Sequence, residues 1–146
     1  MITLRNFTDA DISVLQQYPY RNVPFAKIQE TVHAWNQKRF QGTYFEMFAI
    51  VNPLIIGTIS LYQHAPDIIS CGLEIFPDYR RQGFGKEAMT LALNIAKSKG
   101  YGAVTNQVRS DNIASIALHQ ALHFVSDGNT YKNQKGNDVL IYQKTL

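Results

Sequence analysis

The chain has 146 residues, of which 45% are hydrophobic and 17% charged, so it is long enough for one folded domain and its composition excludes an intrinsically disordered protein. Its 14 basic and 11 acidic residues give a net charge of +3, an excess that suits a polyanionic small ligand and is too small to indicate nucleic-acid binding. Because the chain has one cysteine, Cys71, no signal-peptide core and no apolar run near the ~18 residues of a membrane span, we expect one domain over residues 1–146, in the cytoplasm and without a membrane partner.

The first half of the chain is expected to contain two short helices among strands. Thr8 and Asp11 resemble a capping box that begins one helix. Pro24 suits the first turn of a second helix, which Gly42 would end. The expected strands cover residues 2–4, 44–51, 54–62 and 68–76.

The second half is expected to alternate helices and strands. Its clearest element is a helix whose apolar residues recur at i, i+3, i+4, i+7 and i+8 from Ala88 to Ala96, and which Gly100 closes. The remaining expected elements are a strand over 103–108, a helix from 110 to about 122, and strands over 124–125 and 139–144 on either side of a polar loop over 127–138. This order predicts a mixed α/β sheet.

A glycine-containing turn at residues 77–89 joins the strand over 68–76 to this helix. The first amide groups of a helix have no internal partner, and together with the helix dipole they favour an anion. Gly83 and Gly85 allow a ligand close to the backbone, while Arg80, Arg81 and Lys86 add positive charge. The turn therefore predicts a phosphate or pyrophosphate site. The alternative is a tight turn with solvated arginines.

Two other phosphate motifs fit this turn less well. A Walker loop fails, because Arg80 stands where its first glycine belongs and Glu87 follows the lysine. Residues 83–88 match a relaxed dinucleotide fingerprint, but residues 77–82 separate the turn from its strand, and only about 60 residues follow it. A nucleotide-dependent oxidoreductase is therefore the weaker alternative.

Several motifs in order resemble those of the GNAT superfamily of acetyl-CoA-dependent N-acetyltransferases. Residues 80–85, RRQGFG, match its pyrophosphate motif Q/R-x-x-G-x-G/A, and the preceding PDYR and the stretch from Asn112 to Phe124 are similar to further family motifs. The resemblance implies an α/β (α+β) fold with a mixed, mostly antiparallel sheet of six to seven strands and about four helices. It also implies transfer of an acetyl group from acetyl-CoA to an amine of a small molecule or peptide. Apart from the resemblance, we expect a monomer or homodimer and no metal site. A non-catalytic module that binds acyl-CoA is the alternative.

The resemblance further implies how the coenzyme is held. The backbone of residues 73–75 would pair with the pantetheine arm like an added strand, and the amides from Arg81 to Lys86 would hold the pyrophosphate. Asn112, Ser115 and His119 share one face of an otherwise apolar helix, which suggests the wall of a cleft; alternatively, Asn112 is only an N-cap. The implied cofactor-binding residues are Leu73, Glu74, Ile75, Arg80, Arg81, Gln82, Gly83, Phe84, Gly85, Lys86, Asn112 and Ser115.

The catalytic residues are less clearly marked. Glu74 shares the polar face of its strand with Gly72 and is the first candidate for the base that deprotonates the amine, with Asp67 and His64 as alternatives. His119 stands where many family members have the tyrosine that protonates the thiolate, and it is the candidate acid.

Other positions depart from the family pattern or bear on the acceptor. Gln107 stands where peptide-modifying members often have a glutamate, and Cys71 is expected in the core and not as a nucleophile. The residues that would line the acceptor side are Tyr18, Tyr20, Trp35 and Tyr131. The acceptor stays open among small amines, an antibiotic amine, an amino acid and a protein N-terminus.

Overall fold

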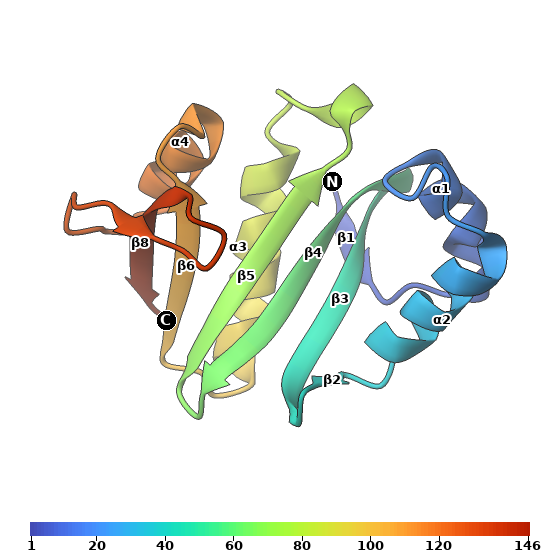
Figure 1. Cartoon of the computed structure of the whole chain (residues 1–146), viewed down its shortest axis with the longest axis horizontal. Coiled ribbons are helices and arrows are strands. Elements are labelled where there is room, and N and C mark those ends of the chain that lie inside the picture. The colour runs from blue at the N-terminus through green and yellow to red at the C-terminus, as the bar shows by residue number, and fades with distance from the viewer.

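One sheet runs through the computed structural model, which describes residues 1–146 (Figure 1). Its strands lie in the order β1-β3-β4-β5-β6-β8-β7, with β2 paired to β3 off this path. All pairs are antiparallel except β5 with β6, so the predicted fold class is confirmed, with eight strands when the two shortest are counted. The strands are β1 (Thr3–Arg5), β2 (Arg39–Phe40), β3 (Thr43–Asn52), β4 (Leu54–Ala65), β5 (Ile68–Ile75), β6 (Ala103–Arg109), β7 (Tyr131–Lys132) and β8 (Asp138–Thr145).

Helices cover both faces of the sheet. The helix α3 packs behind β4 and β5, while α1 and α2 lie against the opposite face near β3 (Figure 1). No helix is both long and apolar enough to cross a lipid bilayer. The helices are α1 (Ile12–Gln17), α2 (Phe25–Trp35), α3 (Phe84–Ser98) and α4 (Ile113–Ala121), with short 3-10 turns η1 (Asp9–Asp11) and η2 (Pro77–Tyr79).

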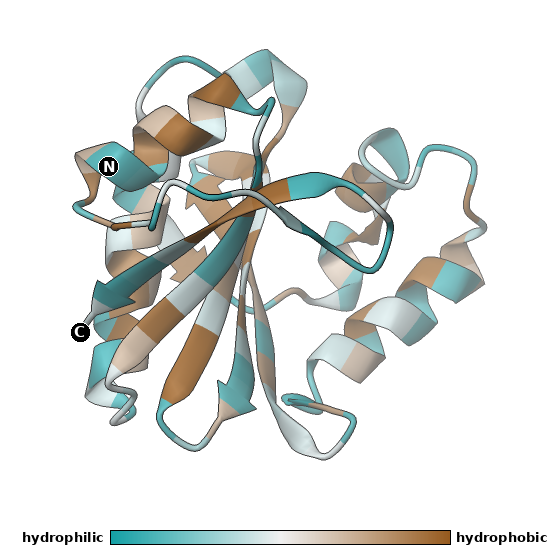
Figure 2. Cartoon of the chain, turned by 60° about the vertical axis from the view of Figure 1, so that its left-hand side comes forward, coloured by the Kyte–Doolittle hydropathy of each residue, from teal (hydrophilic) through white to brown (hydrophobic).

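The sheet has a hydrophobic core on each side. Hydrophobic residues occur along both its strands and the helices that cover it (Figure 2). Successive side chains of a strand point to opposite faces, so Ile55 and Ile56 of β4 are buried in different cores. Full burial of one Val, Leu, Ile or Met side chain in such a core stabilises the fold by about 1.5–3 kcal/mol. On the α3 side the buried residues include Ile59, Leu61, Ile69, Ala88, Met89 and Ala92; on the other side they include Ile12, Leu15, Ile28, Val32 and Ala49.

The capping box at the start of the first helix is confirmed. The Asp11 carboxylate accepts a hydrogen bond from the Thr8 amide at 2.8 Å. It also pairs with Arg5 at 2.8 Å, and these contacts, that with Arg5 first, hold the pKa of Asp11 below its usual range. The buried carboxylate thereby ties the end of β1 to α1.

Three expectations were wrong: one helix end, one strand and one loop. The second helix ends at Trp35 and not at Gly42, because β2 forms a hairpin with β3 around Gln41 and Gly42, both at positive φ. Val125 makes only an isolated bridge to Gln143. The polar loop contains β7, which pairs with β8. Such short pairings are stabilised by the neighbouring strand and leave little sequence pattern.

The pairing of β5 with β6 is short and leaves one edge of β5 free. Only Ile68 with Ala103 and Ile69 with Val104 are paired, and beyond them the two strands diverge toward α4 and the start of α3 (Figure 1). The strand β6 instead pairs with β8 along its whole length. The second half of β5 therefore presents backbone groups on an edge without a partner strand, a surface that can accept an extended ligand.

Candidate active site

The predicted glycine turn presents a row of free amides. Gly83 is the N-cap of α3 and has φ +82°, and Arg81 also has a positive φ of 64°, a region that only glycine enters without strain. The amides from Arg81 to Lys86 make no backbone hydrogen bond, and the first helical bond runs from the Glu87 amide to the Gly83 carbonyl at 3.3 Å. Such a turn at a helix N-terminus favours a bound anion.

The turn is held against the free edge of β5. A Cβ on Gly85 would lie 3.1 Å from Cδ2 of Leu73, so a larger residue there would crowd the Leu73 side chain. Arg80 Nε donates to the Ile75 carbonyl at 2.8 Å, and this bond fixes the turn to the end of the strand. The free amides and the free strand edge thus adjoin each other.

A cavity of about 1010 Å³ lies between this edge, the start of α3 and α4. We call it the cofactor cavity. It is lined by all the predicted cofactor residues except Gln82, and His119 lines it too. Asn112 is also the N-cap of α4, since its Oδ1 accepts from the Ser115 amide at 3.1 Å. Asn112 therefore does both things that the sequence left open: it caps α4 and it lines the cofactor cavity.

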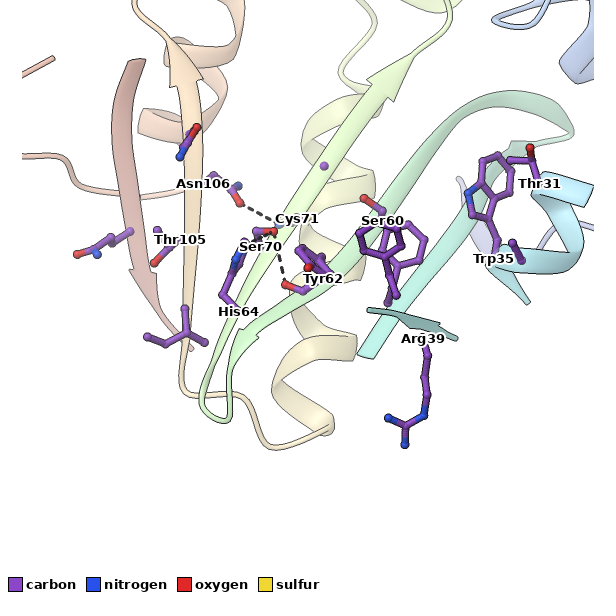
Figure 3. Close-up of a pocket in the computed structure, with 17 residues that line it drawn as sticks. Thr31, Trp35, Arg39, Ser60, Tyr62, His64, Ser70, Cys71, Thr105 and Asn106 are labelled. Carbon is purple, nitrogen blue, oxygen red and sulfur yellow. Dashed lines mark hydrogen bonds between the residues drawn. The ribbon is translucent and has the colours of Figure 1, made fainter. Parts of the chain in front are cut away.

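A second cavity, of about 1040 Å³, lies on the face of the sheet opposite α3. We call it the acceptor cavity, because Trp35, which is predicted to lie on the acceptor side, is in its wall. Figure 3 shows Trp35 from α2 on one side and β4, β5 and β6 on the other. The only residue with a full charge is Arg39, whose guanidinium points away from the labelled residues (Figure 3) and donates to the Gly42 carbonyl at 3.1 Å. The aromatic residues of its wall are Trp35, Phe40, Phe45 and Tyr62, and no Asp or Glu lines it.

The two cavities share four residues: Cys71, Gly72, Asn106 and Gln107. Gly72 pairs with Ser60 of β4, and a Cβ on Gly72 would lie 2.9 Å from the Ser60 Oγ. A side chain at this position would therefore crowd the common wall. The two cavities therefore adjoin each other at Gly72.

Residues 11–124 match the family model described as the acetyltransferase (GNAT) family. The chain belongs to this family. Family membership confirms the predicted activity, acetyl transfer from acetyl-CoA to an amine, and does not favour the non-catalytic alternative. Acetyl-CoA is the co-substrate.

The proteins to which this GNAT chain is similar are also described as acetyltransferases. It is 27% identical over 103 residues to the [Ribosomal protein bS18]-alanine N-acetyltransferase of Escherichia coli (strain K12), a match that covers 66% of this chain and 70% of the relative. A structure of the ribosomal L7/L12 alpha-N-protein acetyltransferase in complex with coenzyme A superposes with a TM-score of 0.85 at 17% identity, covering 99% of this chain and 94% of the other. A putative acetyltransferase from Salmonella typhimurium with its cofactor acetyl-CoA gives 0.73 at 16% identity, covering 100% and 94%.

Glu74 lies on the same face of β5 as Gly72, as predicted from the sequence. Its carboxylate accepts a hydrogen bond from the Tyr18 hydroxyl at 2.8 Å, and this bond raises the pKa of Tyr18. Of the alternative bases, Asp67 packs against Gly102 at the opposite end of β5 and lines neither cavity. His64 lines the acceptor cavity and lies 2.9 Å from the Ser70 hydroxyl.

His119 is buried and bonded at both ring nitrogens. Nδ1 lies 2.7 Å from the Ser115 carbonyl, and Nε2 lies 3.0 Å from Nδ2 of Asn106. Burial, partly offset by the bond to Ser115, lowers the pKa of His119. In this arrangement the ring has no free proton that points into the cofactor cavity.

Asn106 was not predicted from the sequence, and all three tyrosines expected on the acceptor side lie outside the two cavities. Asn106 lies between Val104 and Val108 on the buried face of β6, so a polar residue in an apolar alternation was the available signal. Its Oδ1 accepts from the Cys71 amide at 2.8 Å. Tyr18, Tyr20 and Tyr131 line neither cavity, although Tyr18 contacts Glu74, and Trp35 lines the acceptor cavity as predicted.

Proposed function

We propose that acetyl-CoA lies along the free edge of β5 and that an amine from the acceptor cavity attacks its thioester directly near Gly72. The observation that carries this proposal is the wall shared by the two cavities, which contains Gly72. It supports a ternary complex, in which both substrates are bound before the acetyl group moves.

The cofactor is held mainly by backbone groups in this proposal. The free amides from Arg81 to Lys86 receive the pyrophosphate, with Arg80, Arg81 and Lys86 supplying positive charge. The edge of residues 73–75 that faces away from β4 binds the pantetheine arm. Asn112 and Ser115 contact the arm from α4.

Glu74 acts as the base, through an ordered water. It lies two residues from Gly72 along the strand, or about 6.6 Å at the usual rise of a strand, which is beyond direct reach of an amine at that point. Tyr18 orients its carboxylate. An alkyl amine with a pKa near ~10.4 is only ~0.04% unprotonated at pH 7, and deprotonation costs about 4–5 kcal/mol. For an α-amine with a pKa near ~7.8 the cost falls to about 1 kcal/mol, so a remote base serves an α-amine better.

The acceptor carries one amine on a neutral or apolar body. The acceptor cavity has aromatic side chains and no carboxylate, so it offers no counter-charge to the further positive groups of a polyamine. A peptide N-terminus with a small first residue meets these demands. The E. coli relative is named for acetylation of an alanine of a ribosomal protein, which supports the same class of acceptor.

Calorimetry with acetyl-CoA tests the cofactor site. The Gly83→Asp variant places a carboxylate beside the free amides, and we expect an affinity loss of about 100-fold or more. Gly128→Asp is the matched control, because Gly128 has φ +80° and open space around its Cβ, as Gly83 does, yet lies in the loop before β7. Equal affinity losses in both variants would contradict the proposed pyrophosphate site.

Thiol release from acetyl-CoA tests the acceptor class. The panel contains a peptide with an N-terminal alanine, the same peptide with a blocked N-terminus, a simple alkyl amine and a polyamine. We expect the free peptide to react fastest and the blocked peptide not at all. Faster release with the polyamine would overturn the acceptor assignment and leave the cofactor site intact.

A further inference from the structure

A directed chain of hydrogen bonds links β5, β6 and α4 inside the cofactor cavity. We propose that Asn106 and His119 are positioning residues, which hold the Cys71 amide and so set the point at which β5 becomes free for the pantetheine arm. The effect on acetyl-CoA binding rests on the proposed cofactor site; the hydrogen-bond chain itself does not.

The two groups at the ends of this hydrogen-bond chain fix the direction of every hydrogen bond in it. The Cys71 amide can only donate, so the Asn106 atom facing it is the side-chain oxygen, at 2.8 Å. The Asn106 nitrogen must then donate to His119 Nε2, at 3.0 Å. The Ser115 carbonyl can only accept, so His119 Nδ1 carries the proton, at 2.7 Å. The ring is therefore the neutral tautomer with its proton on Nδ1.

The hydrogen-bond chain lies at the point where the backbone pairing of β5 with β6 ends. The last paired residues are Ile69 and Val104, and Cys71 and Asn106 each come two positions later. There the Asn106 side chain replaces the lost backbone bond (Figure 3). It thereby spaces the diverging strands and leaves the next residues of β5 paired with β4 only, without a partner on the edge that faces β6.

Packing holds the ring of His119 in place. The side chains of Asn106 and His119 belong to the buried polar residues, with exposures of 6% and 4%. Aromatic rings of Phe124 and Tyr142 pack on the imidazole, with centroid distances of 4.8 Å and 5.3 Å. Tyr142 of β8 is the titratable side chain among these ring contacts, and no carboxylate or cation bonds to the ring.

Protonation of His119 would break this chain. A proton on Nε2 would face the donor nitrogen of Asn106, and turning the Asn106 amide would place its nitrogen against the Cys71 amide. Either arrangement leaves buried donors without acceptors, which is costly. The geometry thus keeps the ring neutral and its Nε2 occupied, whereas an acid for the thiolate needs a proton that can leave toward the sulfur. The thiolate of coenzyme A, with a thiol pKa near ~8.5, can instead leave and take its proton from solvent.

Nitrogen NMR of the unaltered protein tests the chain directly. We expect the His119 ring to show the neutral tautomer with the proton on Nδ1 and not to titrate between about pH 5 and pH 8, the range in which histidine normally changes charge. A proton on Nε2, or titration in this range, would overturn the proposal. This readout needs neither a variant nor a functional cofactor site.

Kinetics of two His119 variants separate positioning from acid catalysis. Glutamine at 119 can accept the Asn106 bond through its side-chain oxygen but cannot titrate, so His119→Gln should keep kcat within about threefold and leave the pH profile unchanged. His119→Leu leaves the Asn106 nitrogen unpaired and should raise the KM for acetyl-CoA about tenfold with a smaller change in kcat. His33→Gln is the control, because His33 is exposed on α2 and contacts Asp9.

The opposite pattern would identify an acid. A fall of about 100-fold or more in kcat for His119→Gln, with loss of one limb of the pH profile and an unchanged KM, is the result expected of a proton donor and would overturn the proposal. Asn106→Leu gives an independent check, since it should raise the same KM as His119→Leu. Amide hydrogen exchange at Cys71 should accelerate in both leucine variants, and unaltered exchange would count against the chain.

Discussion

The two cavities beside β5 are lined by different kinds of chemical group. The cofactor cavity is bounded by free backbone groups, namely the amides of the glycine turn and the unpaired edge of residues 73–75. The acceptor cavity is bounded by side chains, among them Trp35 and Tyr62. A backbone site depends on glycines and strand geometry, so it suits a co-substrate that is the same for all family members. A side-chain site can change residue by residue, so in the proposed function it is the acceptor cavity that selects the acceptor.

The largest expected effect is on Glu74, the proposed base, which lines the cofactor cavity two residues from the shared Gly72. Glu74→Gln removes the proposed base but keeps an oxygen that can accept the Tyr18 hydroxyl bond. We expect kcat to fall about 100-fold, with little change in the KM of either substrate, and part of the loss to be recovered at higher pH, where more amine is unprotonated. Steady-state kinetics measure this.

Glu30→Gln is the control, because Glu30 is an exposed carboxylate on α2 that pairs with Lys27. If Glu74→Gln retains full activity at neutral pH, the base assignment is wrong.

An intermediate effect is expected from the acceptor cavity alone. The ring of Tyr62 packs against Phe40, Phe45 and His64, and Tyr62→Ala removes apolar surface worth about 1.5 kcal/mol or more. We expect the KM for the acceptor to rise about tenfold and the KM for acetyl-CoA to stay the same. Tyr131→Ala, on an exposed ring that lines neither cavity, should change neither constant. Parallel increases in both KM values for Tyr62→Ala would remove the distinction between the cavities.

The smallest expected effect is on the cofactor side. Lys86 is exposed in the first turn of α3 and lines the cofactor cavity. Lys86→Ala should raise the KM for acetyl-CoA about threefold at low ionic strength and less in high salt, because exposed charges are screened.

Lys97→Ala, in the last turn of the same helix, is the matched control and should have no effect on this KM. An effect of Lys86→Ala on the acceptor KM, with none on that of acetyl-CoA, would reverse the assignment of the cavities.

Local chemistry explains which predictions succeeded. The capping box of Thr8 and Asp11 and the apolar stripe of α3 involve residues close in sequence, and both are confirmed. The hairpin of β2 and the strand β7 depend on neighbouring strands and were missed. The acid role of His119 stays a prediction, and the bonds of its ring favour the positioning role instead.

The sequence by itself determined the family, the order of the main elements and the glycine turn. These depend on short-range spacing: Gly83 and Gly85 set the backbone that presents the amides, whatever surrounds them. Only the tertiary structure decided that Asn106 reaches Cys71 and that Tyr18 reaches Glu74, 56 residues further along the chain. Those contacts, like the acceptor cavity, join side chains from distant segments, and their positions follow from how the sheet diverges and how helices pack on it.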